Sequence, residues 1–169
     1  ANESSTTPVI AGDHLLASSI SFGMVGLKGA QKEDGSWSLS PLWKNPALTC
    51  YFSTPIPVGD KHVYVVTGQM SFTPTSSLHC VEIASGKILW SVPKVGKYHA
   101  AMLRTGNGKI LLLSDLGDLI LFQPNPEKYE ELAKTKIVKG EGIWAHPALV
   151  DGRVFFRDDK ELYCVQMPR

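Results

Sequence analysis

The sequence lacks an excess of charge of either sign. Its 169 residues include 17 Lys and Arg against 16 Asp and Glu. The densest basic cluster is Lys134, Lys136 and Lys139, whereas a surface that binds nucleic acid carries a basic patch or stripe. We therefore expect no nucleic acid partner.

Long apolar runs are also missing. No run approaches the roughly 20 residues that a helix needs to cross a bilayer, and the opening residues ANESSTTPVI lack the basic and apolar blocks of a signal peptide. The sequence therefore predicts no transmembrane segment. The sequence leaves open whether a signal peptide upstream of Ala1 has been removed.

Segments with helical character are scarce. Only residues 126–136 (PEKYEELAKTK) have the charged composition of a helix, and their apolar residues form no convincing stripe. The 15 Gly and 11 Pro are spread among short apolar runs, which indicates many brief strands joined by turns. We expect an all-β chain in which 126–136 forms either a helical turn or a weak strand.

One sequence motif recurs four times along the chain. It consists of a small or polar residue, Pro or Ala, an apolar pair, a turn with Gly and Asp or Asn, and a β-rich run. The copies begin at Thr7, Thr54, His99 and His146, which are 47, 45 and 47 residues apart. Further strand-like runs complete a pattern of four short strands in about 46 residues, which is typical of a β-propeller blade. Each twisted sheet has two faces to cover, and neighbouring blades cover both.

The number of repeats is not a whole number. Blade 1 spans about 7–50, blade 2 about 54–96, blade 3 about 99–142 and blade 4 about 146–169. The fourth copy ends after three strand-like runs, so the chain holds about three and a half blades. The sequence predicts a single β-propeller domain or fragment. It is either an arc of a seven- or eight-bladed propeller, which we favour because residues 1–6 would make a poor strand, or a small four-bladed propeller.

One segment carries a family signature. Residues 80–90 (CVEIASGKILW) resemble the signature A-x-D-x-x-T-G-K-x-x-W of PQQ-like (quinoprotein alcohol dehydrogenase-like) β-propeller repeats. The resemblance implies that Trp90 and its counterpart Trp43 pack between blades. It also implies an extracytoplasmic location, periplasmic or secreted. Blade 1 departs from the signature by an insertion between Gly26 and Trp43, and blade 3 has Ala133 where the Trp would stand.

The family includes quinone-dependent alcohol and sugar dehydrogenases, the propeller subunit of the outer-membrane β-barrel assembly machinery, and many uncharacterised repeat proteins. The dehydrogenases carry a disulfide between adjacent cysteines over the quinone, with Ca²⁺ ligands beneath it. No two cysteines are adjacent here, so we expect no cofactor. PQQ and Ca²⁺ are implied only if the chain is a fragment of such a dehydrogenase.

The positions of most cysteines and histidines within the repeat predict structural rather than functional roles. Cys80 and Cys164 share an apolar column with Gly26 and Leu121, which predicts small core residues on third strands. Two blade spacings separate Cys80 from Cys164, too far for a disulfide. His14 and His62 share a column with Lys109 and Arg153, which indicates a solvated strand edge. No histidine spacing matches a metal site, and no catalytic constellation is recognisable.

The column that opens each blade is the candidate binding site. First strands line the channel of a propeller, so the residues around blade openings should ring its mouth. Aromatic and polar side chains gather there: Tyr51, Tyr98, His99, Trp144 and His146. The loops 19–22, 69–77, 115–118 and 158–160 should end at the same face. Alternatively, Tyr98 and Trp144 fill gaps between blades, and the two histidines cap first strands.

Three functions follow from these observations. The first is a non-catalytic propeller module that binds a protein or ligand through the channel mouth. The alternative is a fragment of a quinone-dependent dehydrogenase. In a third hypothesis, two copies of the arc form a homodimeric ring, because the outer faces of the terminal blades are apolar sheets that need covering. The partner is thus a protein or the remaining blades of the propeller.

Overall fold

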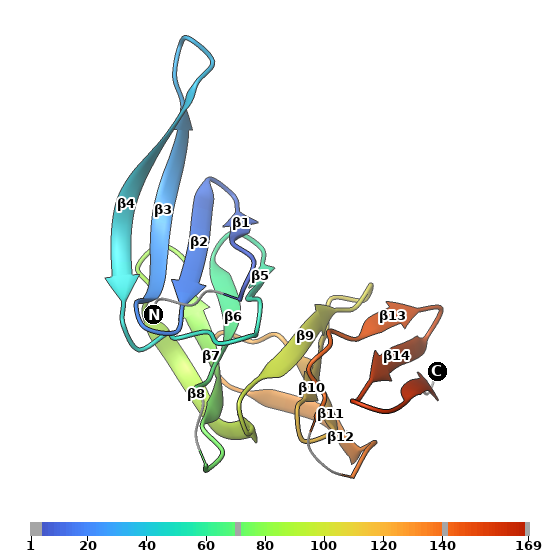
Figure 1. Cartoon of the computed structure of the whole chain (residues 1–169). Helices are drawn as coiled ribbons and strands as arrows, with labels where there is room; N and C mark the ends of the chain where they lie inside the picture. The colour runs from blue at the N-terminus through green and yellow to red at the C-terminus, as the bar shows by residue number, and fades with distance from the viewer. Residues whose placement is uncertain (1–4, 70–71, 140–141, 168–169) are drawn as a thin grey trace.

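The computed structural model is an arc of four antiparallel β-sheets that follow one another along the chain (Figure 1). The structure describes residues 5–69, 72–139 and 142–167. Within these ranges it contains strands and turns but no helix. No described segment therefore has the helical length and hydropathy that a membrane span requires.

Each sheet is built from strands in sequence order, so every neighbouring pair is a hairpin. Sheet 1 contains β1 (Val9–Ala11), β2 (His14–Ser19), β3 (Gly23–Gln31) and β4 (Trp37–Asn45). Sheet 2 contains β5 (Ile56–Val58), β6 (His62–Thr67), β7 (Ser76–Glu82) and β8 (Ile88–Gly96). Sheet 3 contains β9 (Ala100–Arg104), β10 (Ile110–Ser114), β11 (Asp118–Gln123) and β12 (Glu130–Lys136). Sheet 4 contains β13 (Ala148–Val150), β14 (Arg153–Arg157) and β15 (Leu162–Gln166).

The predicted all-β propeller arc, with three four-stranded blades and a three-stranded fourth, is confirmed. The segment with helical composition is a strand instead, because Glu130–Lys136 pairs with β11 in an antiparallel register. It is the outer strand of its sheet and is exposed along nearly its whole length. Its Glu and Lys residues suit an edge strand, which charged side chains protect from unwanted pairing.

The turn between the first and second strand of each blade explains the recurring Gly with Asp or Asn. In sheet 4, Asp151 and Gly152 have φ angles of 49° and 72°. Two consecutive positive φ angles define the tight hairpin turn that matches the twist of the strands, and Asp-Gly is a preferred pair there. Gly12 has a φ of 60° in the corresponding turn of sheet 1.

The hydrophobic core is divided into three clusters, one between each pair of successive sheets. Leu16 and Met24 of sheet 1 belong to a buried cluster with Val63 and Val81 of sheet 2. The opposite face of sheet 2 and one face of sheet 3 form the second cluster, and the other face of sheet 3 packs on sheet 4 in the third. Sheets 2 and 3 are thus covered on both faces, as the repeat of β-propeller blades predicts.

Two tryptophans on fourth strands reach from one sheet to the next. The indole N–H of Trp43 donates to the Ile83 carbonyl oxygen at 2.7 Å, and that of Trp90 donates to the Asn125 carbonyl oxygen at 2.8 Å. The ring of Trp43 lies against the backbone of Gly26 and Gly86, where a Cβ atom would collide with it. Both indoles therefore tie their own blade to the following one.

The cysteines differ in environment. Cys50 and Cys80 are buried, and burial raises the pKa of the Cys50 thiol to about 12. The prediction that Cys164 is a core residue is wrong, because its side chain is exposed. Cys164 lies on the face of sheet 4 that no described sheet covers. A shared repeat column predicts burial only when the next blade is present.

Substituting Gly26 tests the packing of Trp43. Gly26→Ala should lower the free energy of unfolding by about 1–3 kcal/mol, because the new methyl group overlaps the indole and a packed interior has no room for it. Gly106→Ala is the matched control, since a Cβ there meets nothing within 4 Å, and it should change the free energy by less than about 1 kcal/mol. Urea unfolding measures both. Equal unfolding midpoints for the two variants would contradict the packing role of Trp43.

Candidate functional site

An aromatic cluster joins the segments that precede the first strands of three blades. The Trp144 ring stacks on Tyr98, with ring centroids 5.7 Å apart and planes 13° apart. The edge of Phe52 meets Trp144 at 5.4 Å and 84°. Tyr51 in turn contacts Phe52 at 3.9 Å. We name this set the inner aromatic cluster: Tyr51, Phe52, Tyr98, His99 and Trp144.

Blade packing brings these segments together. The first strands lie side by side at the inner edge of the arc, where β1 contacts β5 and β5 contacts β9. The residues just before each first strand therefore meet their counterparts from the neighbouring blades. Phe52 precedes β5, Tyr98 precedes β9 and Trp144 precedes β13.

The Asp115 carboxylate holds the segment 97–99 in place. It accepts hydrogen bonds from the backbone N–H groups of Lys97 at 2.8 Å, Tyr98 at 2.7 Å and, more weakly, His99 at 3.4 Å. Asp115 is itself buried. Because a buried carboxylate is stable only with such donors, it fixes the backbone from which Tyr98 projects.

His99 lies inside the inner aromatic cluster. Its ring stacks on Trp144 with centroids 5.0 Å apart, and neither ring nitrogen has a hydrogen-bond partner of good geometry. Burial lowers the pKa of His99, while the Asp115 carboxylate and the Ile143 backbone oppose that shift. The imidazole therefore favours its neutral form and acts as an aromatic packing group.

The structure separates the five predicted binding residues into two groups. Trp144 and His146 are exposed and Tyr98 is half-buried, so these three reach the surface. Tyr51 and His99 are buried and lie beneath them. Sequence reasoning could place all five near blade openings but could not distinguish these levels, because depth depends on how the neighbouring blade packs.

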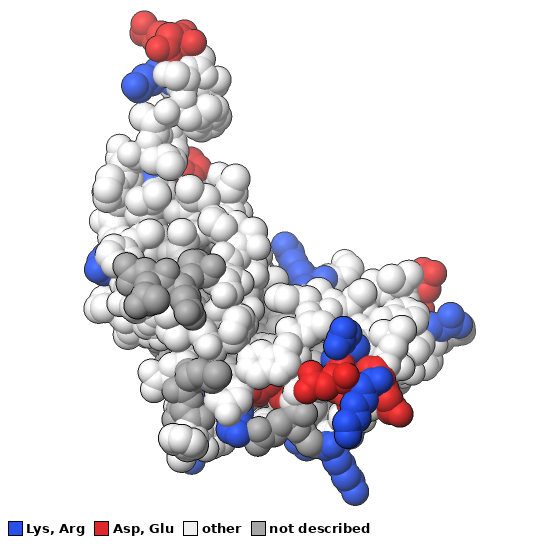
Figure 2. All heavy atoms as spheres, in the orientation of Figure 1, with Lys and Arg blue, Asp and Glu red and all other residues white. Residues whose placement is uncertain are grey.

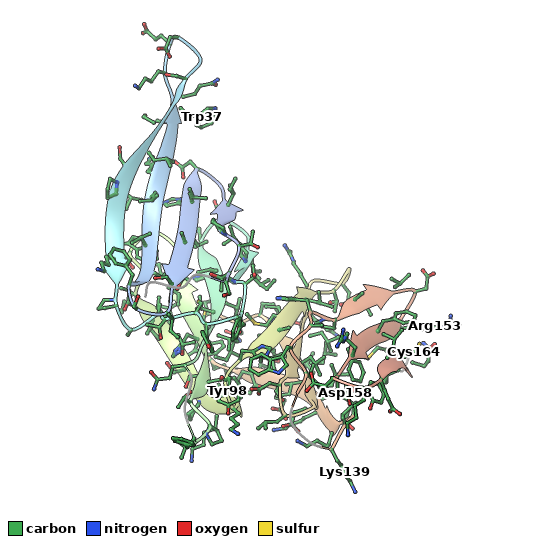
Figure 3. The ribbon with its side chains drawn as sticks, in the orientation of Figure 1. Trp37, Tyr98, Lys139, Arg153, Asp158 and Cys164 are labelled. Carbon is green, nitrogen blue, oxygen red and sulfur yellow. The ribbon has the colours of Figure 1, made fainter. Side chains whose placement is uncertain are left out.

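Two loops complete a pocket beside the exposed rings. A pocket of about 230 Å³ is lined by Tyr98, Asp115, Gly142, Trp144 and Asp159. An adjoining pocket of about 340 Å³ shares Gly142, Trp144 and Asp159 with it. The predicted loops 115–118 and 158–160 therefore do meet the blade openings. In Figure 2, charged side chains gather around the fourth sheet, where Figure 3 labels Asp158.

Gly142 is a residue of this pocket that the sequence did not single out. A Cβ atom at this position would lie 2.9 Å from the Asp159 carboxylate, and its φ of 118° is one that other residues rarely adopt. Of the other predicted loops, 19–22 does not line the pocket, and loop 69–77 includes Met70 and Ser71, which lie outside the described residues.

The described residues do not fit a quinone and calcium site of the dehydrogenase kind. The three cysteines are far apart in sequence. In the parts of the chain that the structure covers, no three His, Cys, Asp or Glu side chains are grouped so as to hold a metal ion. The inner aromatic cluster and its pocket therefore provide aromatic rings beside the carboxylates of Asp115 and Asp159.

Acidic pH should destabilise the fold through its buried histidines. Burial lowers the pKa of both His99 and His79 from the ordinary value of 6.5, so the unfolded chain takes up protons at a higher pH than the folded chain. Stability should be fully present above about pH 7 and decrease as the pH falls below about 6.5. Urea unfolding at pH 7.5 and pH 5.5 measures this. His99→Phe, which keeps an aromatic ring on Trp144, should show a smaller decrease, whereas His62→Gln should match the parent chain.

Removing the Asp115 carboxylate should loosen the segment that carries Tyr98. Asp115→Ala leaves buried backbone N–H groups without an acceptor, which should cost about 1–3 kcal/mol of unfolding free energy. Asp118→Ala is a control, since Asp118 pairs with Lys136 at 3.2 Å near the surface and such pairs contribute up to about 1 kcal/mol. Near-ultraviolet circular dichroism should report a loosened Tyr98–Trp144 stack in Asp115→Ala only. Unchanged spectra in both variants would argue against the anchoring role.

The fold is shared with a known propeller. No protein-family profile matches the sequence, and no curated protein matches it. The crystal structure of BamB from Moraxella catarrhalis, a β-propeller, matches 98% of this chain and 59% of its own, with a TM-score of 0.51 and 13% sequence identity. This chain therefore spans less than two thirds of the length of that protein. At this identity the likeness concerns the fold alone, and it identifies the chain as an arc of a β-propeller.

Proposed function

We propose that this chain is a non-catalytic β-propeller module that binds a protein partner through the surface formed by Tyr98, Trp144, His146 and Asp159, here named the Trp144 face. One observation carries the proposal. The Trp144 indole leaves 41% of its surface exposed although it stacks on Tyr98 and His99 at the rim of a pocket.

A large aromatic side chain held rigidly at the surface is suited to binding. Tryptophan and tyrosine dominate the energetic centres of protein interfaces, since they offer large contact areas and lose little conformational freedom. Trp144 has already lost much of that freedom, because Tyr98 and His99 stack on it and Phe52 meets it edge-on. Binding through this ring therefore costs little additional entropy.

The pocket next to Trp144 selects the chemistry of the partner. Its lining combines two aromatic residues, Tyr98 and Trp144, with two acidic residues, Asp115 and Asp159. Asp115 already accepts backbone hydrogen bonds, whereas Asp159 is exposed and its carboxylate lies close to Gly142. A partner side chain with an apolar stem and a hydrogen-bond donor at its end, such as Arg or Lys, fits this combination.

Two finer assignments belong to the same proposal. The signature in residues 80–90 and the inter-blade indoles of Trp43 and Trp90 support membership of the PQQ-like repeat proteins. A module of that family would work outside the cytoplasm, in the periplasm or as a secreted protein. Neither assignment requires a bound quinone.

Peptide selection tests the Trp144 face. Peptides from a random displayed library, selected on the purified chain and enriched in Arg or Lys beside apolar residues, should lose at least about tenfold in affinity for Trp144→Ala, which corresponds to about 1.4 kcal/mol. Phe22→Ala is the matched control, because Phe22 is an exposed aromatic residue between β2 and β3 of sheet 1 and does not line the pocket. Fluorescence anisotropy with labelled peptides gives both affinities. Peptides that bind Trp144→Ala as tightly as the parent chain would refute the assignment.

A further inference from the structure

His99 is buried with its hydrogen-bonding capacity unused. It is 2% exposed, and neither ring nitrogen has a hydrogen-bond partner among the described residues. His79, which is also buried, shows the usual arrangement, because its ring nitrogens lie 2.9 Å from the Thr67 hydroxyl oxygen and 2.8 Å from the Ser91 hydroxyl oxygen. Since buried polar groups are almost always hydrogen-bonded, an unpaired imidazole calls for an explanation.

The His99 side chain contacts the groups that support the Trp144 face. Its ring stacks on the Trp144 indole, with centroids 5.0 Å apart and planes 26° apart, and it meets Phe52 edge-on with centroids 5.8 Å apart. The backbone N–H of His99 also donates to the Asp115 carboxylate at 3.4 Å, directly after Tyr98, which Figure 3 labels. A movement of His99 therefore reaches the indole through the stack and Tyr98 through the chain.

Charged groups of both signs surround the His99 imidazole. The Asp115 carboxylate, from the turn between β10 and β11, favours its protonated form, whereas His146, from the segment before β13, opposes it. The Lys97 ammonium also lies in this region, 4.9 Å from the Tyr98 ring centroid. Burial outweighs the attraction of Asp115 and lowers the pKa of His99 from its ordinary value of 6.5. The neutral imidazole is therefore the stable form at neutral pH.

Protonation of His99 conflicts with this arrangement. An imidazolium has an N–H donor on each nitrogen, and a buried charge is stable only when it is paired and hydrogen-bonded. The Asp115 carboxylate can pair with it, but this group already accepts backbone hydrogen bonds from Lys97 at 2.8 Å and Tyr98 at 2.7 Å. The imidazolium must therefore compete for Asp115 or leave its place beside Trp144 for water. Both changes disturb the stack of Tyr98 and Trp144.

We propose that His99 is a proton-operated switch of the Trp144 face, whose protonation releases a cationic partner. The inference rests on the proposed function, in which Tyr98, Trp144 and Asp159 bind an Arg or Lys side chain. Two effects act in the same direction, since the imidazolium loosens the stacked rings and adds positive charge beside the carboxylates that attract the partner. By linkage, a partner that binds the neutral form more tightly also lowers the pKa of His99 further.

The direction of the pH dependence follows from the burial of His99. Burial holds its pKa below 6.5, so the Trp144 face is intact at neutral pH and changes as the pH falls below about 6.5. Burial also lowers the pKa of His79, but the hydroxyl partners of that residue belong to β6 and β8 of sheet 2. His79 therefore affects the stability of the fold, whereas His99 affects the binding surface as well.

A titration of the chain alone tests the switch. Nuclear magnetic resonance follows the ring protons of His99, the backbone amides of Lys97 and Tyr98 and the indole N–H of Trp144 between about pH 7.5 and pH 5. All these signals should shift with one midpoint. His99→Phe, which keeps an aromatic ring on Trp144, should remove the shifts, and His62→Gln, the matched control, should retain them. His99 signals that do not titrate over this range, or that titrate while the others stay fixed, would overturn the proposal.

Peptide affinities at two pH values test the release of the partner. The peptides are selected ones that bind through Trp144 and contain no Asp, Glu or His. Anisotropy is measured at about pH 7.5 and at the lowest pH, down to about 5, at which circular dichroism shows a folded chain. The parent chain and His62→Gln should lose at least about tenfold in affinity at the lower pH, and His99→Phe less than about threefold, as expected for a coupling between two sites.

The two experiments distinguish failure of the switch from failure of the proposed function. Coupled shifts of the resonance signals without any Trp144-dependent peptide would refute the proposed partner and leave the proton-driven change of the face standing. Trp144-dependent peptides that lose affinity equally in the parent chain and in His99→Phe, or lose none in either, would overturn the switch and leave the proposed function standing.

Discussion

Face-to-face packing of apolar β-sheets is the interaction on which this structure depends. Each sheet is only three or four short strands wide and cannot cover its own apolar faces. Sheets 2 and 3 bury large side chains such as Tyr64, Leu112 and Phe122 between them, and each buried side chain of this kind contributes about 1.5–3 kcal/mol. The same requirement explains why successive sheets pack face to face, because each sheet covers an apolar face of the sheet before it.

This packing also forms the candidate binding surface. When sheets follow one another around an arc, their first strands converge and the residues before those strands meet. Phe52, Tyr98 and Trp144 come from three different blades, yet their rings lie within 6 Å of one another where they pair. Asp115 then fixes the backbone at Tyr98. The exposed indole of Trp144 is thus held in place by groups that also connect the blades.

Sequence reasoning reached the fold because the relevant information is local and repeated. A period of about 46 residues, Gly-containing turns and short apolar runs specify a blade without reference to its neighbours. The candidate site was less accessible to such reasoning. The openings of the blades and the loops 115–118 and 158–160 were identified, but the burial of Tyr51 and His99 and the contribution of Gly142 were not. Those properties arise from contacts between blades, for which no short-range pattern exists.

The sequence by itself determined the number of repeats, the strand order within each blade and the side of each strand that is apolar. These follow from alternation along a strand and from turn chemistry, which act over a few residues. The tertiary structure alone decided which apolar faces are covered. Cys80 and Cys164 share a repeat column, yet Cys80 is buried and Cys164 is exposed. The physical reason is that a side chain's environment depends on the sheet placed against it, and sheet 4 has no described neighbour on that side.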